Sequence, residues 1–379
     1  MNAPPPIAQA TRRAIREQVA LVLQGGGALG AYQAGVYQAL MEGGIEPDWV
    51  IGTSIGAING ALIAGNAPEN RIARLQEFWD GVGKKSALDP LWPESWQTAV
   101  FGNTLANFST VLSGIPGFFA PNPQAVWGPT FPLGIERASY YTTDPLKATL
   151  GRLVDFDWLN RRQVRLSVGA VNVRTSEMCY FDSQKMPLAP AHIMASGALP
   201  PAFPAVTIDG ESYWDGGIYS NTPIEVVLDD VPRRNSLIFS VNVWQPAGAH
   251  PTTLQQVMAR QKDIQFASRG KSHVARQAQI HRLRHVVREL ARRLPEELRA
   301  DPVVQDLADY GCGTLMHLVR LLSPRLDGED HTKDIDFTRA GIERRWKAGH
   351  DHARKVLAEK PWEGEVDTLA GIVIHEGSA

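Results

Sequence analysis

Two neighbouring stretches decide the fold of this chain: residues 20–30, which read ALVLQGGGALG, and residues 49–56, which read WVIGTSIG. Each begins as a short apolar run that ends at glycine, which is typical of a buried strand entering a tight turn. A helix is expected after each turn, the first ending at Gly43-Gly44 and the second at about Gly65. Strand, helix, strand, helix with short links predicts an α/β fold, in which a mainly parallel sheet has helices on both faces. Further strands are expected over residues 164–173, 178–181, 211–214 and 237–243.

The bulk composition excludes several classes of protein. The chain has 379 residues, of which 44% are hydrophobic, enough for a large core. Its net charge of -2 gives no basic footprint for a nucleic-acid partner. Cys179 and Cys312 are too few for a zinc site and are expected to be idle thiols in a reducing compartment. Because residues 1–20 lack an apolar signal segment and no long apolar run follows, we expect a cytoplasmic protein without metal or cofactor.

The chain divides into regions of different character. Residues 1–17 are expected to be a flexible tail and residues 18–245 the catalytic α/β domain. Within it, residues 81–140 are rich in aromatic residues, glycine and proline. This pattern indicates either a lid or acyl-chain channel, or an insertion with its own small core. Residues 246–360 are expected to be mainly helical, and residues 361–379 a tail.

The helical region has a two-faced pattern. One predicted face is apolar and the other is basic. The apolar face holds Ile280, Leu283, Val286, Val287, Leu290 and Leu294, and the basic face holds Arg282, Arg288, Arg292 and Arg293. The basic face indicates either an ordinary solvated surface or peripheral contact with an anionic membrane.

The first site that carries chemistry is the glycine run Gly25, Gly26, Gly27 with Gly30, placed between a strand and a helix. Glycines there let the backbone aim several N–H groups at one point, where a phosphate or an oxyanion can bind. Gly25, Gly27 and Gly30 also match a dinucleotide-binding fingerprint, with Asp48 as its ribose-binding acid. The run by itself does not separate these two functions.

The second site is the pattern Gly52-Thr53-Ser54-Ile55-Gly56, which follows a strand and opens a helix. This is the arrangement of a nucleophile elbow, in which a sharp turn projects the serine hydroxyl. Gly52 and Gly56 would remove the Cβ clashes of such a turn. Ser54 is therefore the candidate nucleophile.

The third site is Asp215-Gly216-Gly217, just after a short predicted strand. Alone it would be read as an ordinary turn. Together with the other two sites it supplies what a serine nucleophile needs, a base within reach and N–H donors for the developing oxyanion. None of the ten histidines lies in a turn motif beside a strand end, so Asp215 is the candidate base.

Four separated blocks resemble the patatin-like phospholipase family: residues 23–36, 52–59, 195–204 and 215–223. The resemblance covers about residues 18 to 245 and implies a three-layer α/β/α sandwich. The segments Lys333–Phe337 and Trp346–Gly349 look like the extra domain of some bacterial members, for which we predict no role.

The same resemblance implies a Ser54–Asp215 dyad, with the amides of Gly25, Gly26, Gly27 and Ile55 at the oxyanion hole. Gly30, Gly52, Gly56, Gly216 and Gly217 would support these motifs, and Ser196 and Asn221 would fix loops. This chain departs from the family where many members carry Arg or Lys, because it has Leu29. Since burial would raise the pKa of Asp215, we also expect backbone N–H donors around its carboxylate.

These observations predict a serine lipid acyl hydrolase acting on a phospholipid, a lysophospholipid or a related ester. A hydroxyacid polyester esterase or an acyl thioesterase would use the same dyad. Three other hypotheses stay open: a dinucleotide-binding oxidoreductase, an α/β-hydrolase with a histidine triad, and a membrane- or protein-binding module. The sequence does not indicate the oligomeric state.

Overall fold

A single mixed sheet forms the centre of the molecule in the computed structural model. The model describes residues 18–83 and 114–379, apart from 328, 366, 368, 378, 379 and the side chains of 268–271. The tail expected at residues 1–17 lies outside these residues. The strands described are β1 (Gln18–Leu23), β2 (Trp49–Thr53), β5 (Arg165–Asn172), β6 (Met178–Asp182), β7 (Val206–Ile208), β8 (Glu211–Asp215), β9 (Ser236–Asn242), β10 (Met316–Leu322) and β11 (Ile372–Glu376). Their order is β11-β10-β9-β1-β2-β5-β8-β7, and β6 pairs with β5.

The inner strands are parallel, as predicted, and their alternating side chains form two cores. Leu21 and Leu23 of β1 belong to one buried cluster, whereas Ala20 and Val22 belong to another. Because successive side chains of a strand point to opposite faces, both faces of the sheet are covered. β1 pairs in parallel with β2 and with β9, so it lies in the middle of the sheet.

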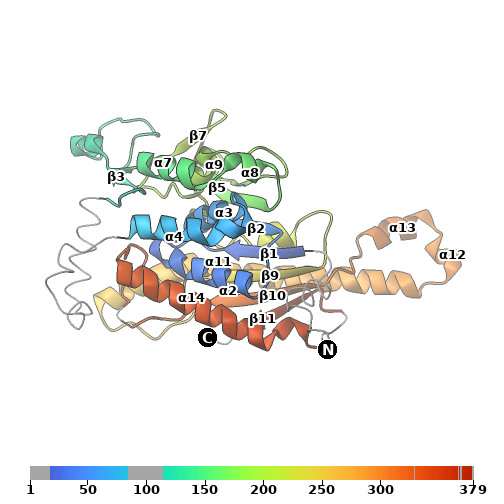
Figure 1. The fold of residues 1–379 in the computed structure, drawn as a ribbon. Helices are drawn as coiled ribbons and strands as arrows, with labels where there is room; N and C mark the ends of the chain where they lie inside the picture. Colours follow the sequence, from blue (N-terminus) through green and yellow to red (C-terminus); the bar gives the residue numbers. More distant parts are fainter. Residues whose placement is uncertain (1–17, 84–113, 328, 366, 368, 378–379) are drawn as a thin grey trace.

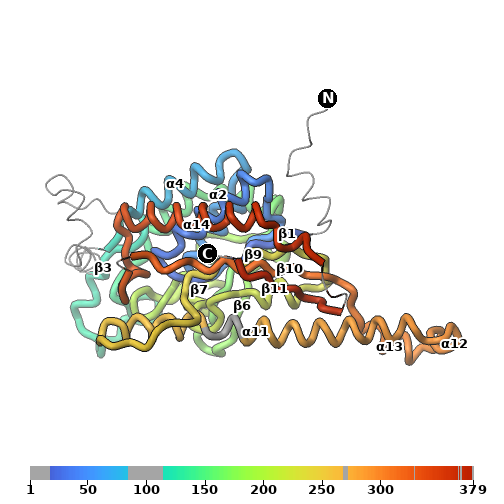
Figure 2. Tube along the Cα trace, turned by 90° about the horizontal axis from the view of Figure 1, so that it is seen from below, coloured from blue at the N-terminus to red at the C-terminus, as the bar shows by residue number. Residues whose placement is uncertain are grey.

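Helices cover the two faces unequally. α2 (Gly30–Glu42), α4 (Arg71–Val82) and α14 (Arg339–Glu359) lie on one side, and α11 (Leu254–Arg293) lies on the other (Figures 1 and 2). The remaining helices described are α3 (Ile55–Ala64), α7 (Asp144–Leu153), α8 (Phe156–Asn160), α9 (Pro190–Ser196), α10 (Glu225–Leu228), α12 (Glu296–Arg299), α13 (Pro302–Asp309), and the short 3-10 turns η1 (Gly27–Leu29), η2 (Pro68–Asn70), η3 (Pro123–Trp127), η4 (Gly216–Ile218) and η5 (Pro361–Glu363). The three-layer sandwich predicted from the family resemblance is confirmed.

The C-terminal region is mainly helical, but it is not separate from the α/β domain. β10 pairs in parallel with β9 over seven residues, and β11 pairs with β10. The sheet thus continues past residue 245, and Ile372–Glu376 is a strand where a tail was expected. α14 packs closely on α2: a Cβ added to Gly35 would lie 1.9 Å from the carbonyl oxygen of Trp346. A short apolar run among charged helices carries too little periodicity to reveal such strands from sequence.

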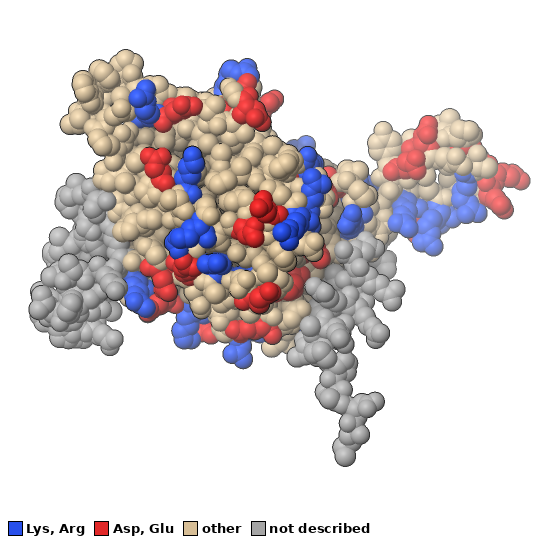
Figure 3. All heavy atoms as spheres, turned by 45° about the horizontal axis from the view of Figure 1, so that its top comes forward, with Lys and Arg blue, Asp and Glu red and all other residues tan. Residues whose placement is uncertain are grey.

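The outer half of α11 leaves the body of the protein and forms an arm with α12 and α13 (Figures 1 and 2). The predicted apolar face of this helix is therefore only partly covered. Leu283 and Leu290 are 65% and 61% exposed. The arm carries both basic and acidic side chains (Figure 3).

The region expected to be a lid or an insertion is described only in part, because residues 84–113 lie outside the described residues. β3 (Ala120–Pro121) pairs with β4 (Tyr141–Thr142), and η3 lies between them. Phe118 and Phe119 are buried against the body, whereas Trp127 is exposed. Among the residues that the structure describes, no helix is both long and apolar enough to cross a membrane.

Candidate active site

The turn between β2 and α3 holds Ser54 in a conformation that L-residues rarely adopt. Its backbone has φ 57° and ψ -125°, and it is the residue before the first turn of α3. Strain of this kind persists only where the surrounding structure enforces it, and it is common at functional sites. Here the backbone N–H of Ser54 donates to Ser196, to its hydroxyl oxygen at 3.0 Å and its carbonyl oxygen at 3.1 Å. The sharp strand-to-helix turn predicted at Ser54 is therefore present.

The two glycines of the elbow are required by packing. A Cβ on Gly52 would lie 2.3 Å from the carbonyl oxygen of Gly56. A Cβ on Gly56 would lie 2.3 Å from the carbonyl oxygen of Leu23, at the end of β1. Both distances are far below van der Waals contact with rigid backbone. The G-x-S-x-G pattern thus reflects how closely α3 approaches the ends of β1 and β2.

Strand topology brings Asp215 to Ser54. Residues of β5 pair with β6 on one edge, while Gly169 also pairs with Thr53 of β2 and Ala170 with Asp215 of β8. β2 and β8 must therefore occupy the same opposite edge of β5. Because β2 is parallel to β5 and β8 is antiparallel, the two strands run toward each other and end at adjacent positions. The residue after β2 and the last residue of β8 consequently meet.

The carboxyl group of Asp215 is buried and hydrogen-bonded. Its side chain is only 2% exposed, and its Oδ1 accepts the N–H of Gly217 at 2.7 Å. The Ser54 side chain lies close enough to this carboxyl group to lower its pKa. Burial raises the pKa of Asp215 to about 6, while Ser54 and the bond from Gly217 act in the opposite direction. The expected backbone donor is confirmed at Gly217, and the carboxylate stays ionised at neutral pH.

Ser196 and Asn221 hold the loops around this pair, as predicted. The Ser196 hydroxyl donates to the carbonyl oxygen of Gly169 at 2.6 Å, which ties α9 to β5 beside the elbow. The Asn221 side-chain amide donates to the carbonyl oxygen of Gly25 at 3.1 Å. These bonds join three segments that lie far apart in the sequence.

The glycine run lies next to Ser54, but its amides are not equivalent. A Cβ on Gly25 would lie 3.1 Å from the Cβ of Ser54. The Gly25 N–H already donates to the carbonyl oxygen of Asn221 at 3.1 Å, so its predicted place in an oxyanion hole is not supported. Within the described residues, the amides of Gly26 and Gly27 have no acceptor. Ile55, the first residue of α3, also lacks an intrahelical acceptor for its N–H.

Sequence reasoning missed the segment that supports the glycine run from behind. Gly27 has φ +55°, and a Cβ there would lie 2.2 Å from the carbonyl oxygen of Asp334. That same oxygen accepts the N–H of Ala28 at 2.8 Å. From sequence, the segment Lys333–Phe337 carries only its likeness to an extra domain. The signal for a contact was its charged side chains, Lys333 beside Asp334, in a segment that also holds apolar residues.

Two crossed ion pairs hold this segment on α11. Lys262 of α11 contacts Asp334 at 2.7 Å, and its neighbour Asp263 contacts Lys333 at 2.9 Å. The second pair is almost fully buried, with side chains 9% and 5% exposed. The C-terminal region therefore helps to position the glycine run. Leu29, which stands where many family members carry Arg or Lys, is buried in the core and supplies no positive charge there.

The geometry is unfavourable to two of the alternative functions, the dinucleotide-binding oxidoreductase and the α/β-hydrolase with a histidine triad. Asp48 accepts the N–H of Val19, near the start of β1, whereas Gly25 follows the end of that strand. Six strand residues span roughly 20 Å, so Asp48 cannot bind the ribose of a nucleotide on the glycine run. No histidine among the described residues is hydrogen-bonded to Ser54 or Asp215. Nor do the described residues include a cluster of three or more metal-ligating side chains.

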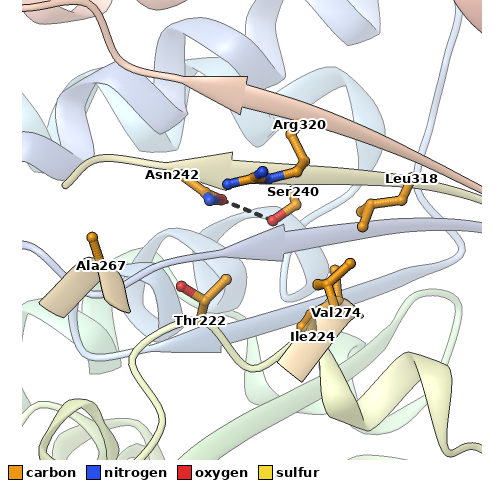
Figure 4. A pocket seen from close by; sticks show the side chains of 8 residues that line it. All are labelled: Thr222, Ile224, Ser240, Asn242, Ala267, Val274, Leu318 and Arg320. Atoms are coloured by element: carbon orange, nitrogen blue, oxygen red, sulfur yellow. Dashed lines mark hydrogen bonds between the residues drawn. The ribbon is translucent and has the colours of Figure 1, made fainter. Parts of the chain in front are cut away.

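A small enclosed cavity lies elsewhere. Figure 4 shows it between β9, β10 and α11, lined among others by Ser240, Asn242 and Thr222. Its volume is about 10 Å³, the room of one water molecule. None of the predicted catalytic residues lines it. The cavity lies behind the glycine run, because its lining residue Thr222 accepts a hydrogen bond at 2.7 Å from Gln24, the residue before Gly25.

Comparison with known proteins gives consistent matches. A family model described as patatin-like phospholipase matches residues 21–228, and a second, described as patatin phospholipase, matches residues 264–369. The mouse patatin-like phospholipase domain-containing protein 7 is 30% identical over 212 residues, 55% of this chain and 12% of that protein. The lysophospholipase nte1 of Aspergillus terreus is 57% identical over 85 residues, 22% of this chain and 6% of that protein.

Among solved structures, VipD from Legionella pneumophila aligns with a TM-score of 0.38 and 17% identity, covering 90% of this chain and 67% of that one. By contrast, the chain spans only 12% and 6% of the length of the two curated relatives named above.

Proposed function

Because this chain belongs to the patatin-like phospholipase family, we propose that it is a lipid acyl hydrolase with Ser54 as nucleophile and Asp215 as base. One observation carries the proposal: the strained turn at Ser54 brings its side chain to the buried carboxyl group of Asp215, whose pKa that side chain lowers. A serine hydroxyl is a weak nucleophile unless an adjacent base takes its proton. The raised pKa of Asp215 makes its carboxylate a stronger base than an exposed aspartate.

The proposed reaction has two halves. Ser54 Oγ attacks the acyl carbonyl carbon while Asp215 accepts the hydroxyl proton. The C–O bond to the alcohol then breaks, and the alcohol leaves with the proton from Asp215. Asp215 next takes a proton from water, whose oxygen attacks the acyl carbon. The bond from that carbon to Ser54 Oγ then breaks, Oγ takes the proton back from Asp215, and the fatty acid is released. The free enzyme is restored without any cofactor.

The negative oxygen that forms in each half needs hydrogen-bond donors. The free amides of Gly26, Gly27 and Ile55 are the donors that we assign to it. Each such donor contributes about 3 kcal/mol to stabilisation of the transition state. With Leu29 in place of a cation, backbone amides and the start of α3 supply this stabilisation.

The substrate class proposed is a phospholipid or lysophospholipid carboxyl ester, in line with the descriptions of the matching family models. A hydroxyacid polyester or an acyl thioester would react by the same steps. The dyad does not distinguish these carbonyl compounds, because it contacts only the reacting group.

Covalent labelling tests the proposal. The purified chain is treated with a fluorophosphonate probe, and the modified residue is identified by mass spectrometry. We expect modification of Ser54, no labelling of Ser54→Ala, and slow labelling of Asp215→Asn. Ser212→Ala is the matched control, because Ser212 lies on β8 and, among the described residues, its hydroxyl is hydrogen-bonded only to Thr207, at 3.4 Å.

Substrate choice follows from competition. Phosphatidylcholine, lysophosphatidylcholine, an acyl thioester and a hydroxybutyrate oligomer are each added before the probe. Protection by one of the first two supports the lipid class, and protection only by the others would replace it. Ester hydrolysis that persists in Ser54→Ala would refute the proposed mechanism.

A further inference from the structure

The segment between β3 and β4 exposes several large apolar side chains. We call these five side chains the apolar tip: Val126 (84% exposed), Trp127 (63%), Phe131 (45%), Ile135 (38%) and Tyr140 (58%). The rings of Trp127 and Phe131 are in contact, with centroids 4.8 Å apart. Single exposed apolar residues are ordinary, but a cluster of this kind marks an interaction site.

The segment that carries the tip has almost no charge. Residues 95–135 contain no Asp, Glu, Lys, Arg or His, although 21% of the whole chain is charged. Between residues 114 and 140 the only charges are Glu136 and Arg137, which cancel. The lobe at the upper left of Figure 3 is accordingly mostly tan. A surface without charge does not attract a charged partner.

The base of the tip is firmly attached to the body. Phe118 and Phe119 are buried, and the ring of Phe119 lies 5.2 Å from that of Phe203. The side chain of Asn122 donates to the carbonyl oxygens of Arg137 and Ser139 at 2.9 and 2.8 Å. The exposed side chains of the tip are therefore carried by a loop whose base is held by these contacts.

The tip is also linked to the candidate nucleophile. The N–H groups of Tyr140 and Tyr141 donate to the carbonyl oxygens of Pro201 and Ala202, at 3.1 and 2.9 Å. That loop begins at Ser196, which accepts the N–H of Ser54. One short stretch of chain, residues 196–202, thus contacts both Tyr140 of the tip and the turn that holds Ser54.

We propose that the apolar tip docks on the surface of an uncharged or zwitterionic lipid layer. This inference deepens the proposed function. Docking itself is independent of hydrolysis, whereas the statement that the ester substrate comes from that lipid surface rests on the proposed function. Tryptophan and tyrosine favour the boundary between lipid headgroups and acyl chains, where an apolar ring with a polar edge fits.

A second protein molecule fits the tip less well than lipid does. A stable protein interface uses about 20–30 residues from each side, whereas the tip offers five large apolar side chains and no charged group to set a register. An anionic surface also fits less well, because the net charge over residues 114–140 is zero. Binding should accordingly be insensitive to salt.

The test separates binding from hydrolysis by using Ser54→Ala as the parent. This protein is sedimented with phosphatidylcholine vesicles at low and at high salt, alone and with the added pair Trp127→Asp and Phe131→Asp. Leu307→Asp is the matched control, because Leu307 is 60% exposed on the arm, a value close to that of Trp127. Folding of each variant is checked by circular dichroism and thermal unfolding.

We expect the parent and the control to bind alike at both salt concentrations. The pair of aspartates should weaken binding about a hundredfold or more, since each buried aromatic side chain contributes about a tenfold factor. In the active background the same pair should slow hydrolysis of vesicle lipid and leave hydrolysis of a short soluble ester unchanged.

Three outcomes would overturn the inference. The aspartate pair could bind phosphatidylcholine as the parent does. Binding could require anionic lipid and vanish at high salt, which would place it on the basic helix. Light scattering could show a dimer that the aspartate pair dissociates, which would assign the tip to a second copy. Failure of the proposed function is separate: it would leave vesicle binding intact with no hydrolysis of any ester.

Discussion

Replacing Asp215 by asparagine should abolish hydrolysis and at the same time stabilise the fold. Asparagine keeps the shape of the side chain and an oxygen that can accept the bond from Gly217, but it cannot take a proton. What it removes is a carboxyl group that must be ionised while buried. Loss of activity and gain of stability from one substitution would mark a residue kept for its chemistry.

The size of the stability gain follows from the pKa of Asp215. Burial raises this pKa from 3.8 to about 6 in the folded protein. A carboxyl group with a raised folded-state pKa binds its proton more tightly when folded. Its contribution to stability is therefore complete below about pH 4 and is lost as the pH rises through 6. A shift of about two units corresponds to about 3 kcal/mol at pH 8 and about 1 to 2 kcal/mol at pH 5.

Urea unfolding of the parent and of Asp215→Asn at about pH 5 and about pH 8 measures this difference. We expect the variant to be more stable at both pH values, with the larger advantage at pH 8. Asp306→Asn, exposed on α13, is the control and should show the same pH dependence as the parent. An advantage of Asp215→Asn that is absent, or that shrinks as the pH rises, would refute the burial argument.

Three further predictions concern the same site. Ester hydrolysis should rise with pH through about 6 and then level off, because the Asp215 carboxylate is the active form; a pH profile of kcat/KM checks this, and a rate that falls above pH 6 would contradict it. Gly56→Ala should lower the free energy of unfolding by about 1–3 kcal/mol, because its Cβ would lie 2.3 Å from the carbonyl oxygen of Leu23. Gly151→Ala on α7, with nothing within 4 Å of its added Cβ, should raise stability slightly. Lys333→Met should lower the free energy of unfolding by about 3–5 kcal/mol, because it leaves Asp263 buried without its partner. It should also slow fluorophosphonate labelling of Ser54. The double variant with Asp263→Leu should recover most of the lost stability, and no recovery would mean that the lysine acts in another way.

The sequence alone was sufficient for features that depend on neighbouring residues. The apolar runs that end at Gly25 and Gly52, and the glycines around Ser54, report local backbone geometry, so they predicted two parallel strands and the elbow. The motif order also placed a glycine run, a serine and an aspartate in one site.

Only the tertiary structure decided how segments far apart in the chain meet. The approach of β2 and β8 on one edge of β5 depends on strand pairing, which no local pattern encodes. The use of the Gly25 amide by Asn221, and the support of Ala28 by Asp334, depend on backbone groups that every sequence possesses. Strands β10 and β11 are short segments that become strands because β9 offers an edge to β10, and β10 in turn offers one to β11. Local residue types determine turns and helices, whereas packing between distant segments determines which donors remain free for a substrate.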